Sequence, residues 1–415
     1  MFNRSLRPAA LLASFMLLAA RSPAVAQDWN QWRGPNRDGV VAPAASPTAW
    51  PEALKPGWKL TVGVGHASPI VVGNTVIVFA RQEEREVVVC VDLATGKVVW
   101  QDAYDAPYTV NPIARAHGPG PKATPVAANG KLYTFGITEI LSCYDVGSGK
   151  LVWRKNFADQ FRGTSPDFGT AASPLVDRGL LIVHVGTSGQ GALTAFDATT
   201  GEVKWRWTGD GPSYVSPIAV DLGGTRQIVT QSQSAIVSVA ADTGKLLWSM
   251  PFTTPYVQNI VTPVLYKDLL IFSGLNQGVM AVRALKKGDG WVTETVWRNN
   301  DVGMYMNSPV LSGDLIFGLS HKNKGQFFSV EAGSGKTIWV GEARQGDNAA
   351  MLLAGAFVVS LTSDADLVVA KVGPGGLETV RKYKAADSQT WAHPVLVGRR
   401  LLIKDATTLA LWTIG

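Results

Sequence analysis

The chain has 415 residues, of which 46% are hydrophobic and 17% charged, with 43 glycines, 14 tryptophans and 2 cysteines. This composition is too apolar for a disordered chain, and two cysteines cannot staple a chain this long into a small disulfide-rich fold. The formal net charge of +6 falls to +3 without the first 26 residues, which hold three arginines and no acid. So small a charge excludes the concentrated basic surface that nucleic-acid binding needs.

The first 26 residues have the layout of a secretory signal peptide. Two arginines precede an apolar run from Ala9 to Ala20, and Ala24-Val25-Ala26 supplies small residues for cleavage. The run is too short to span a bilayer, and no cysteine follows it to carry a lipid anchor. The sequence therefore predicts a signal peptide over residues 1–26, an extension over residues 27–55, and a periplasmic or secreted protein that does not span the membrane.

Beyond the extension, one sequence unit recurs along the chain. The segment Cys90 to Trp100 recurs in copies that end at Trp153, Trp205 and Trp339; a copy one residue out of step ends at Trp248 and a lengthened copy at Trp297. Upstream of the copies, Ser-Pro or Thr-Pro pairs begin at residues 68, 124, 173, 216, 262 and 308. Two degenerate copies near residues 349 and 393 bring the series to eight units. Their mean spacing of about 46 residues is typical of four-stranded propeller blades.

Each unit predicts four β-strands joined by tight turns. In the first unit, residues 69–72 and 76–79 flank a Gly73-Asn74 turn, and residues 87–91 form the apolar run of a strand covered on both faces. The next turn is expected to end at Gly96, since a tight turn often needs a residue with positive φ and glycine adopts one readily. The outer strand then ends in a tryptophan that we expect to pack against the neighbouring blade. The tryptophans expected in this docking role are Trp58, Trp100, Trp153, Trp205, Trp248, Trp297 and Trp339.

The last unit lacks an outer strand, and a spare strand precedes the first unit. Residues 393–415 end after a third strand, whereas residues 56–62 have no unit of their own. We therefore expect an all-β fold over residues 56–415, an eight-bladed β-propeller of four-stranded antiparallel blades closed by the N-terminal strand. Closure leaves only short strand edges. Trp29 and Trp32 of the extension should dock on the propeller surface, because two free indoles would form an exposed apolar patch.

The two cysteines, Cys90 and Cys143, occupy the same position of adjacent units. Equivalent points on two packed sheets lie about 10 Å apart. A disulfide needs Cα atoms within roughly 7 Å. The sequence therefore predicts two separate, buried thiols.

The repeated Ala-x-Asp-x-x-Thr-Gly-x-x-x-Trp pattern resembles the tryptophan-docking repeat of the PQQ-like, quinoprotein-type propellers, over residues 56–415. That superfamily includes quinoprotein dehydrogenases, which oxidise alcohols or sugars with pyrroloquinoline quinone (PQQ) and calcium. It also includes the propeller lipoprotein of the outer-membrane β-barrel assembly machinery, which binds partners. The segment from Asp28 to Gly39 resembles the start of many exported propellers of this type. The resemblance implies the fold more strongly than the function, because one fold serves many functions.

The features that the resemblance implies for an enzyme are not evident in this sequence. A dehydrogenase of the calcium type shows an adjacent cysteine pair over the quinone, an aspartate base and acidic calcium ligands, whereas Cys90 and Cys143 lie 53 residues apart. The five histidines lack the close spacing of a metal site. We expect a non-catalytic scaffold, monomeric and without cofactor or metal, that binds a protein, an envelope component or a small ligand through its loops. The alternative is a PQQ-dependent dehydrogenase of an alcohol or sugar.

Loops that lead from an outer strand to the next inner strand should gather at one mouth of a central channel. A concave cluster of polar and aromatic side chains there suits a small ligand, although the same residues can simply line a water-filled channel. The proline-rich loop over residues 102–123 should cover this mouth. The candidate ligand-binding residues are His66, Arg115, His117, Asn259, Asn307, His321, Asn348, Trp391 and His393.

Overall fold

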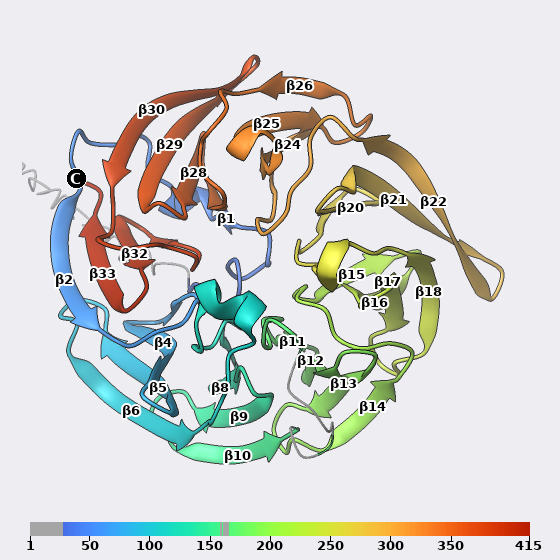
Figure 1. Ribbon diagram of the computed structural model, residues 1–415, viewed down its shortest axis with the longest axis horizontal. Coiled ribbons are helices and arrows are strands. Elements are labelled where there is room, and N and C mark those ends of the chain that lie inside the picture. Colours follow the sequence, from blue (N-terminus) through green and yellow to red (C-terminus); the bar gives the residue numbers. More distant parts are fainter. Residues whose placement is uncertain (1–27, 158–159, 161–165) are drawn as a thin grey trace, which may run out of the picture.

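The computed structural model describes residues 28–157, 160 and 166–415, so the predicted signal peptide lies outside the described residues. The described strands form eight sheets arranged in a ring, and the chain runs around the ring in sequence order (Figure 1). This arrangement confirms the predicted eight-bladed propeller of antiparallel blades.

Each blade is a sheet whose strands follow one another from the axis to the rim. Blades one to four contain β3 Ile70–Val72, β4 Thr75–Gln82, β5 Arg85–Asp92 and β6 Val98–Asp105; β7 Val126–Ala128, β8 Lys131–Phe135, β9 Ile140–Asp145 and β10 Leu151–Asn156; β11 Leu175–Asp177, β12 Leu180–Thr187, β13 Gln190–Asp197 and β14 Val203–Trp207; β15 Ile218–Leu222, β16 Thr225–Gln231, β17 Ala235–Ala240 and β18 Leu246–Pro251.

Blades five to eight contain β19 Val264–Tyr266, β20 Leu269–Gly274, β21 Gly278–Lys287 and β22 Gly290–Asn299; β23 Val310–Ser312, β24 Leu315–Ser320, β25 Gln326–Glu331 and β26 Thr337–Val340; β27 Ala349–Ala354, β28 Phe357–Thr362, β29 Asp366–Gly373 and β30 Gly376–Lys384; β31 Val395–Val397, β32 Arg400–Lys404, β33 Thr408–Thr413 and β2 Lys55–Thr61. The remaining elements are the short strand β1 Val40–Val41 and the 3-10 helices η1 Pro43–Ala45, η2 Pro112–His117, η3 Pro255–Val257 and η4 Lys322–Lys324.

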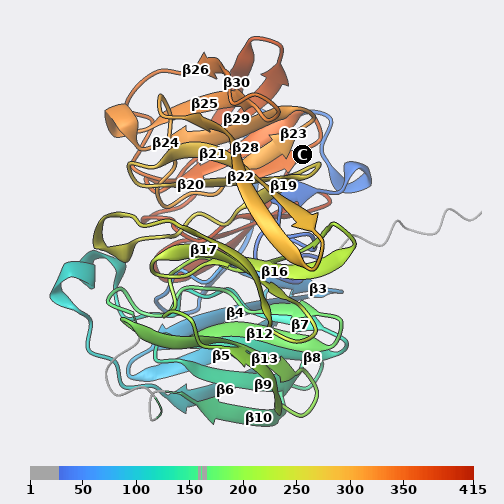
Figure 2. The same ribbon diagram turned by 90° about the vertical axis from the view of Figure 1, so that its right-hand side faces the viewer.

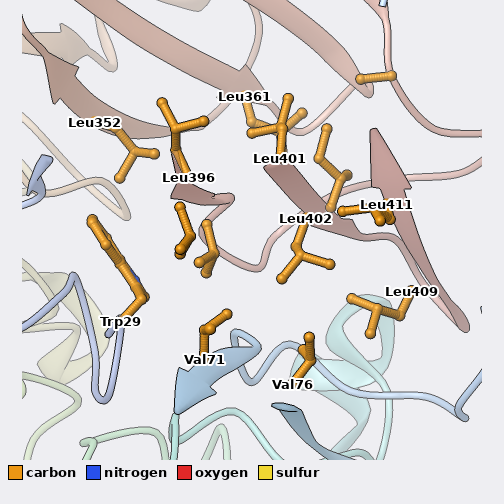
Figure 3. Packing of buried hydrophobic residues seen from close by; sticks show 14 of the residues in the cluster. Trp29, Val71, Val76, Leu352, Leu361, Leu396, Leu401, Leu402, Leu409 and Leu411 are labelled. Atoms are coloured by element: carbon orange, nitrogen blue, oxygen red, sulfur yellow. The ribbon is translucent and has the colours of Figure 1, made fainter. Parts of the chain in front are cut away.

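The N-terminal strand closes the ring, as predicted. β2 pairs antiparallel with β33, with Lys59 opposite Ala410, and so supplies the outer strand of blade eight. A continuous apolar cluster joins blades seven, eight and one, and Figure 3 shows Leu352, Leu401 and Val71 among its side chains. Closure therefore rests on packed side chains as well as on strand pairing.

The outer-strand tryptophans dock on the next blade. The Trp58 indole N–H donates to the Leu93 carbonyl at 3.0 Å, within the turn that ends at Gly96. Gly96 has φ +69°, and a Cβ there would lie 2.6 Å from the Trp58 ring. The repeated glycine thus provides both the turn geometry and the space for the indole. The same bond, at 3.0–3.2 Å, joins Trp100 to Val146, Trp153 to Thr199, Trp205 to Ala241 and Trp297 to Ala332.

Trp248 departs from this pattern. Its indole N–H donates to the Gln227 side chain of its own blade at 2.9 Å, not to the following blade. The following blade lacks the repeated turn, because β21 and β22 continue into a long hairpin that projects beyond the rim in Figure 1. No turn carbonyl is therefore in place to accept the bond.

The Ser-Pro and Thr-Pro pairs link the inner ends of neighbouring blades. The backbone N–H of one residue donates to the hydroxyl of its counterpart in the next blade, at 2.8–3.1 Å. These bonds join Ser68 to Thr124, Thr124 to Ser173, Ser173 to Ser216, Thr262 to Ser308 and His393 to Ser68. The repeated hydroxyl thus ties adjacent blades together close to the axis, just before each inner strand.

The extension crosses the axis of the ring. Trp29 pairs with Val71 of blade one, and β1 adds a parallel fifth strand to blade seven, for which the repeat predicts four. Arg37 is buried and donates to the carbonyls of Ser173 and Pro174 before blade three. A short segment can reach the inner ends of blades one, three and seven only by lying across the centre. It is therefore docked, as predicted, but within the ring rather than on its surface.

Both cysteines are free and buried, as predicted. Burial raises the pKa of each thiol to about 11. Among the described residues, no helix is long and apolar enough to cross a membrane.

Candidate functional site

The candidate site lies on the loop face, the side of the ring at which each outer strand leads into the next inner strand. The loop after β6 carries η2, which Figure 1 places over the centre of the ring and Figure 2 shows as a teal coil projecting from one face. This placement agrees with the expectation that the proline-rich loop covers the mouth. Below it lies a cavity of about 140 Å³.

Most of the wall of this cavity is formed by residues that occupy one repeated position of the sequence unit. Seven blades carry a Ser-Pro, Thr-Pro or His-Pro pair before the inner strand, and the residue two positions before that pair borders the cavity. Asn348 takes the equivalent place in blade seven, where the pair is lost. We call these eight residues the mouth ring: His66, Lys122, Ala171, Tyr214, Ile260, Met306, Asn348 and Trp391. The other lining residues are Trp32, His117, Phe168, Ser216, Gln258, Thr262 and Ser308.

Aromatic rings crowd one side of the cavity. The centroid of the Trp391 ring lies 5.1 Å from that of His117 and 5.9 Å from that of His66. Trp32 of the extension borders the cavity at the channel end, where its N–H donates to Thr262 at 3.2 Å and its ring meets His393 edge-on at 4.5 Å. The extension thus closes the channel beneath the cavity.

Among the described residues, the ionisable side chains at the cavity are the bases Lys122, His66 and His117 and the phenol Tyr214, whose pKa is raised by burial. Burial lowers the pKa of His66 to about 3, with the charges of Lys122 and Lys404 adding to the effect, so this imidazole is neutral. Burial also lowers the pKa of Lys122 and of Lys404 to about 8. No Asp or Glu of the described residues borders the cavity. At neutral pH the site therefore carries positive charge.

Several polar atoms at the cavity have no hydrogen-bond partner among the described residues. They are Lys122 Nζ, Trp391 Nε1, His66 Nε2 and Asn348 Oδ1, and all four atoms are buried. Lys404 differs, because its ammonium donates to the carbonyl of Gly65 at 2.6 Å. Buried polar groups are normally paired, so the four free atoms mark a place where a ligand or ordered water would bind.

The structure brings four of the nine predicted ligand-binding residues together around the cavity: His66, His117, Asn348 and Trp391. His393 lies one layer deeper, against Trp32. Arg115 is exposed on η2 and does not border the cavity.

The other three hold loops in place. The Asn259 amide donates to the Ser232 carbonyl at 2.8 Å. The Asn307 side chain bonds both the N–H and the carbonyl of Leu319. A ring nitrogen of His321 lies 2.7 Å from the Gly303 carbonyl. These bonds give the three side chains a structural role away from the cavity.

Sequence reasoning missed Lys122, Trp32 and the apolar part of the wall. The position two residues before each Ser-Pro or Thr-Pro pair is a signal that could have found the mouth ring. Trp32 has no such signal, because it reaches the cavity only through the path of the extension.

The side chains at the cavity do not fit calcium-bound PQQ. Calcium is bound by oxygen ligands, most often carboxylates. The mouth ring contains no acid, and among the described residues no group of three or more His, Cys, Asp and Glu is arranged to hold a metal. The free cysteines Cys90 and Cys143 belong to strands of separate blades and do not border the cavity.

Comparison with known proteins gives two kinds of relative. The outer membrane protein assembly factor BamB of Shewanella oneidensis is 26% identical over 232 residues, which cover 52% of this chain and 56% of that protein. The dehydrogenase subunit of the quinone alcohol dehydrogenase of Komagataeibacter europaeus is 33% identical over 122 residues, 28% of this chain and 16% of that protein. The matched stretches thus take up less than two thirds of either relative.

Among solved structures, the quinohemoprotein alcohol dehydrogenase of Comamonas testosteroni superimposes with a TM-score of 0.69 at 16% identity, covering 94% of this chain and 80% of that one. An identity this low shows the shared fold alone. The protein family described as outer membrane protein assembly factor BamB matches residues 83–341. This match spans more than half of the chain, and the chain therefore belongs to that family.

Proposed function

We propose that this protein is a non-catalytic scaffold of the cell envelope that binds another protein through its loop face. The observation that carries the proposal is a group of exposed apolar side chains on two short helices of this face. Ile113 on η2 is 60% exposed, and Tyr256 and Val257 on η3 are 75% and 41% exposed. Exposed apolar and aromatic side chains of this kind are typical anchors of protein interfaces.

The backbone of η3 supports this interpretation. Tyr256 and Val257 both have positive φ, 58° and 56°, in a region that non-glycine residues rarely adopt. Such a conformation costs free energy and persists where the surrounding structure holds it. The strain presents both side chains to solvent instead of burying them. Family membership and the predicted signal peptide support a place in the envelope.

The dehydrogenase alternative has less support. Its sequence matches cover 28–37% of the chain, and among the described residues the cavity lacks the carboxylates that calcium and a general base need. Addition of PQQ with calcium, followed by dye-linked oxidation of alcohols and sugars, tests it directly. Turnover in this assay would contradict the scaffold proposal.

A photo-crosslinking experiment in the native host tests the scaffold proposal. A photoreactive amino acid replaces Tyr256, Ile113 or, as a control, Val99, which is 54% exposed on the rim strand β6. We expect Tyr256 and Ile113 to crosslink to the same envelope protein and Val99 not to. The double variant Ile113→Asp/Tyr256→Asp should lose that partner while keeping the melting temperature. Absence of a common partner at the two loop-face positions would overturn the proposal.

A further inference from the structure

We propose that the cavity behind η2 binds a small monocarboxylate with an apolar or aromatic body, and that Lys122 pairs with its carboxylate. The lining of this site does not include Ile113 or Tyr256, so the inference does not depend on the scaffold function. It rests on the free polar atoms of the cavity, on its charge and on its apolar wall.

Lys122 provides an anion-binding group with no partner in the described part of the protein. Its Nζ is buried and makes no hydrogen bond, and no ion pair joins it to an acid within the same residues. Glu86 is the carboxylate whose charge acts on it, but neither a hydrogen bond nor an ion pair joins Glu86 to Lys122; its two oxygens accept from Tyr104 at 2.6 Å and from the Ile137 N–H at 2.7 Å. The ammonium is therefore available to an anion that enters the cavity.

The neighbouring free atoms fit the rest of a carboxylate site. The Trp391 indole N–H is an obligate donor that finds no acceptor among the described residues, and both Trp391 and Lys122 belong to the mouth ring. His66 is neutral, so its free Nε2 can take part in a hydrogen bond without repelling a cation. The absence of Asp and Glu from the described lining removes the usual source of repulsion for an anion.

The apolar wall selects against small hydrated anions. Trp32, Phe168, Ile260 and Met306 border the same cavity, and η2 lies over it. Phosphate and sulfate carry up to two charges and no apolar part, whereas among the described lining residues Lys122 is the one ammonium and the surface of the lining is mostly apolar. Lys404 does not border the cavity, and its ammonium already donates to the carbonyls of Gly65 and Asp405. A single carboxylate on an apolar or aromatic body matches this wall best.

Ligand titrations with the purified protein test the proposal. The probes are benzoate and indole-3-acetate, their neutral amides, and inorganic phosphate and sulfate, followed by calorimetry and by tryptophan fluorescence. We expect at least one carboxylate to bind about tenfold more tightly than its amide or phosphate. Failure of both carboxylates to bind up to about 10 mM, or tighter binding of phosphate, would overturn the proposal.

Two variants locate the site. Lys122→Met keeps most of the aliphatic stem, and Trp391→Phe keeps an aromatic ring without the N–H. We expect each to weaken carboxylate binding by about tenfold or more, while Lys324→Met, at an exposed lysine of η4 on the same face, leaves it unchanged. Melting curves show whether each variant is folded. Wild-type affinity in folded Lys122→Met, or in folded Trp391→Phe, would overturn the assignment.

Discussion

At the scale of single residues, Glu139 joins two blades through a buried carboxyl group. Its side chain accepts from the Gly186 N–H of blade three, at 2.8 and 3.1 Å to the two oxygens. Its backbone φ is 65°, which places the side chain toward the neighbouring blade at the cost of local strain. Burial raises its pKa from 4.5 to about 8.

This pKa predicts a pH-dependent stability that Glu139→Gln should remove. A folded pKa above the unfolded one stabilises the fold fully below pH 4.5, and the contribution is lost as the pH rises to about 8. Relative to the variant, the wild type should lose up to about 1.4 kcal/mol of unfolding free energy per pH unit in this window. Denaturation at several pH values measures the difference.

The comparison with the variant cancels groups that act in the opposite direction. The buried histidines His66 and His184 have lowered pKa values, so their contribution is lost as the pH falls. Glu83→Gln is the control, because Glu83 lies in the equivalent turn of blade one, also has a positive φ, 53°, and is exposed. Parallel pH profiles for the wild type and Glu139→Gln would show that folding does not raise the pKa of Glu139.

At the scale of the blade, neighbouring blades are held together by a repeated contact, in which the indole of one blade packs on a glycine turn of the next. Sequence periodicity identifies both partners, because five copies place a glycine four residues before the tryptophan. The geometry shows that the two partners in contact belong to different copies, because the indole of one blade packs on the glycine of the next blade.

Two alanine substitutions separate turn strain from docking. Gly96→Ala places a Cβ 2.6 Å from the Trp58 ring at φ +69°, whereas Gly130→Ala has φ +73° and no heavy atom within 4 Å. Both should lose about 1–2 kcal/mol from the strained conformation. Gly96→Ala should lose roughly 2 kcal/mol more, because the indole and its bond to Leu93 must move. Chemical denaturation gives both values, and equal losses would argue against docking as the reason for Gly96.

At the scale of the whole molecule, the extension acts as a tie across the ring. Arg33 and Arg37 are buried at the centre, and burial lowers their pKa values to about 10 and about 9. Arg33 donates to the Pro309 carbonyl before blade six, while Arg37 donates before blade three. Opposite sides of the ring are thereby joined through the axis.

Arg37→Met should therefore destabilise the whole propeller. It leaves the buried carbonyls of Ser173 and Pro174, and the Gln31 side chain, without their donor. We expect a loss of about 2–4 kcal/mol in unfolding free energy, and faster amide exchange in blade three. Arg115→Met is the control, because Arg115 is exposed on η2. An Arg37→Met protein with the unfolding free energy of the wild type would show that the contacts of Arg37 across the ring do not stabilise the fold.

The sequence by itself determined the number of blades, their four-strand pattern, the closing strand and the docking tryptophans other than Trp248. These features are readable because each arises from local periodicity: apolar runs, a glycine turn and a tryptophan at fixed spacing. Two separate thiols followed from the same register. The domain boundary between residues 27–55 and 56–415 remains a prediction.

Only the tertiary structure decided what lies at the axis. The fifth strand of blade seven is two residues long and has no pattern of its own, and the path of Trp32 and the two arginines depends on contacts with blades far along the chain. The mouth ring is likewise built from one residue per blade, with a mean spacing of about 46 positions between His66 and Trp391. Ring closure brings these residues together. No local pattern encodes their contact, because it depends on the closed geometry of all eight blades.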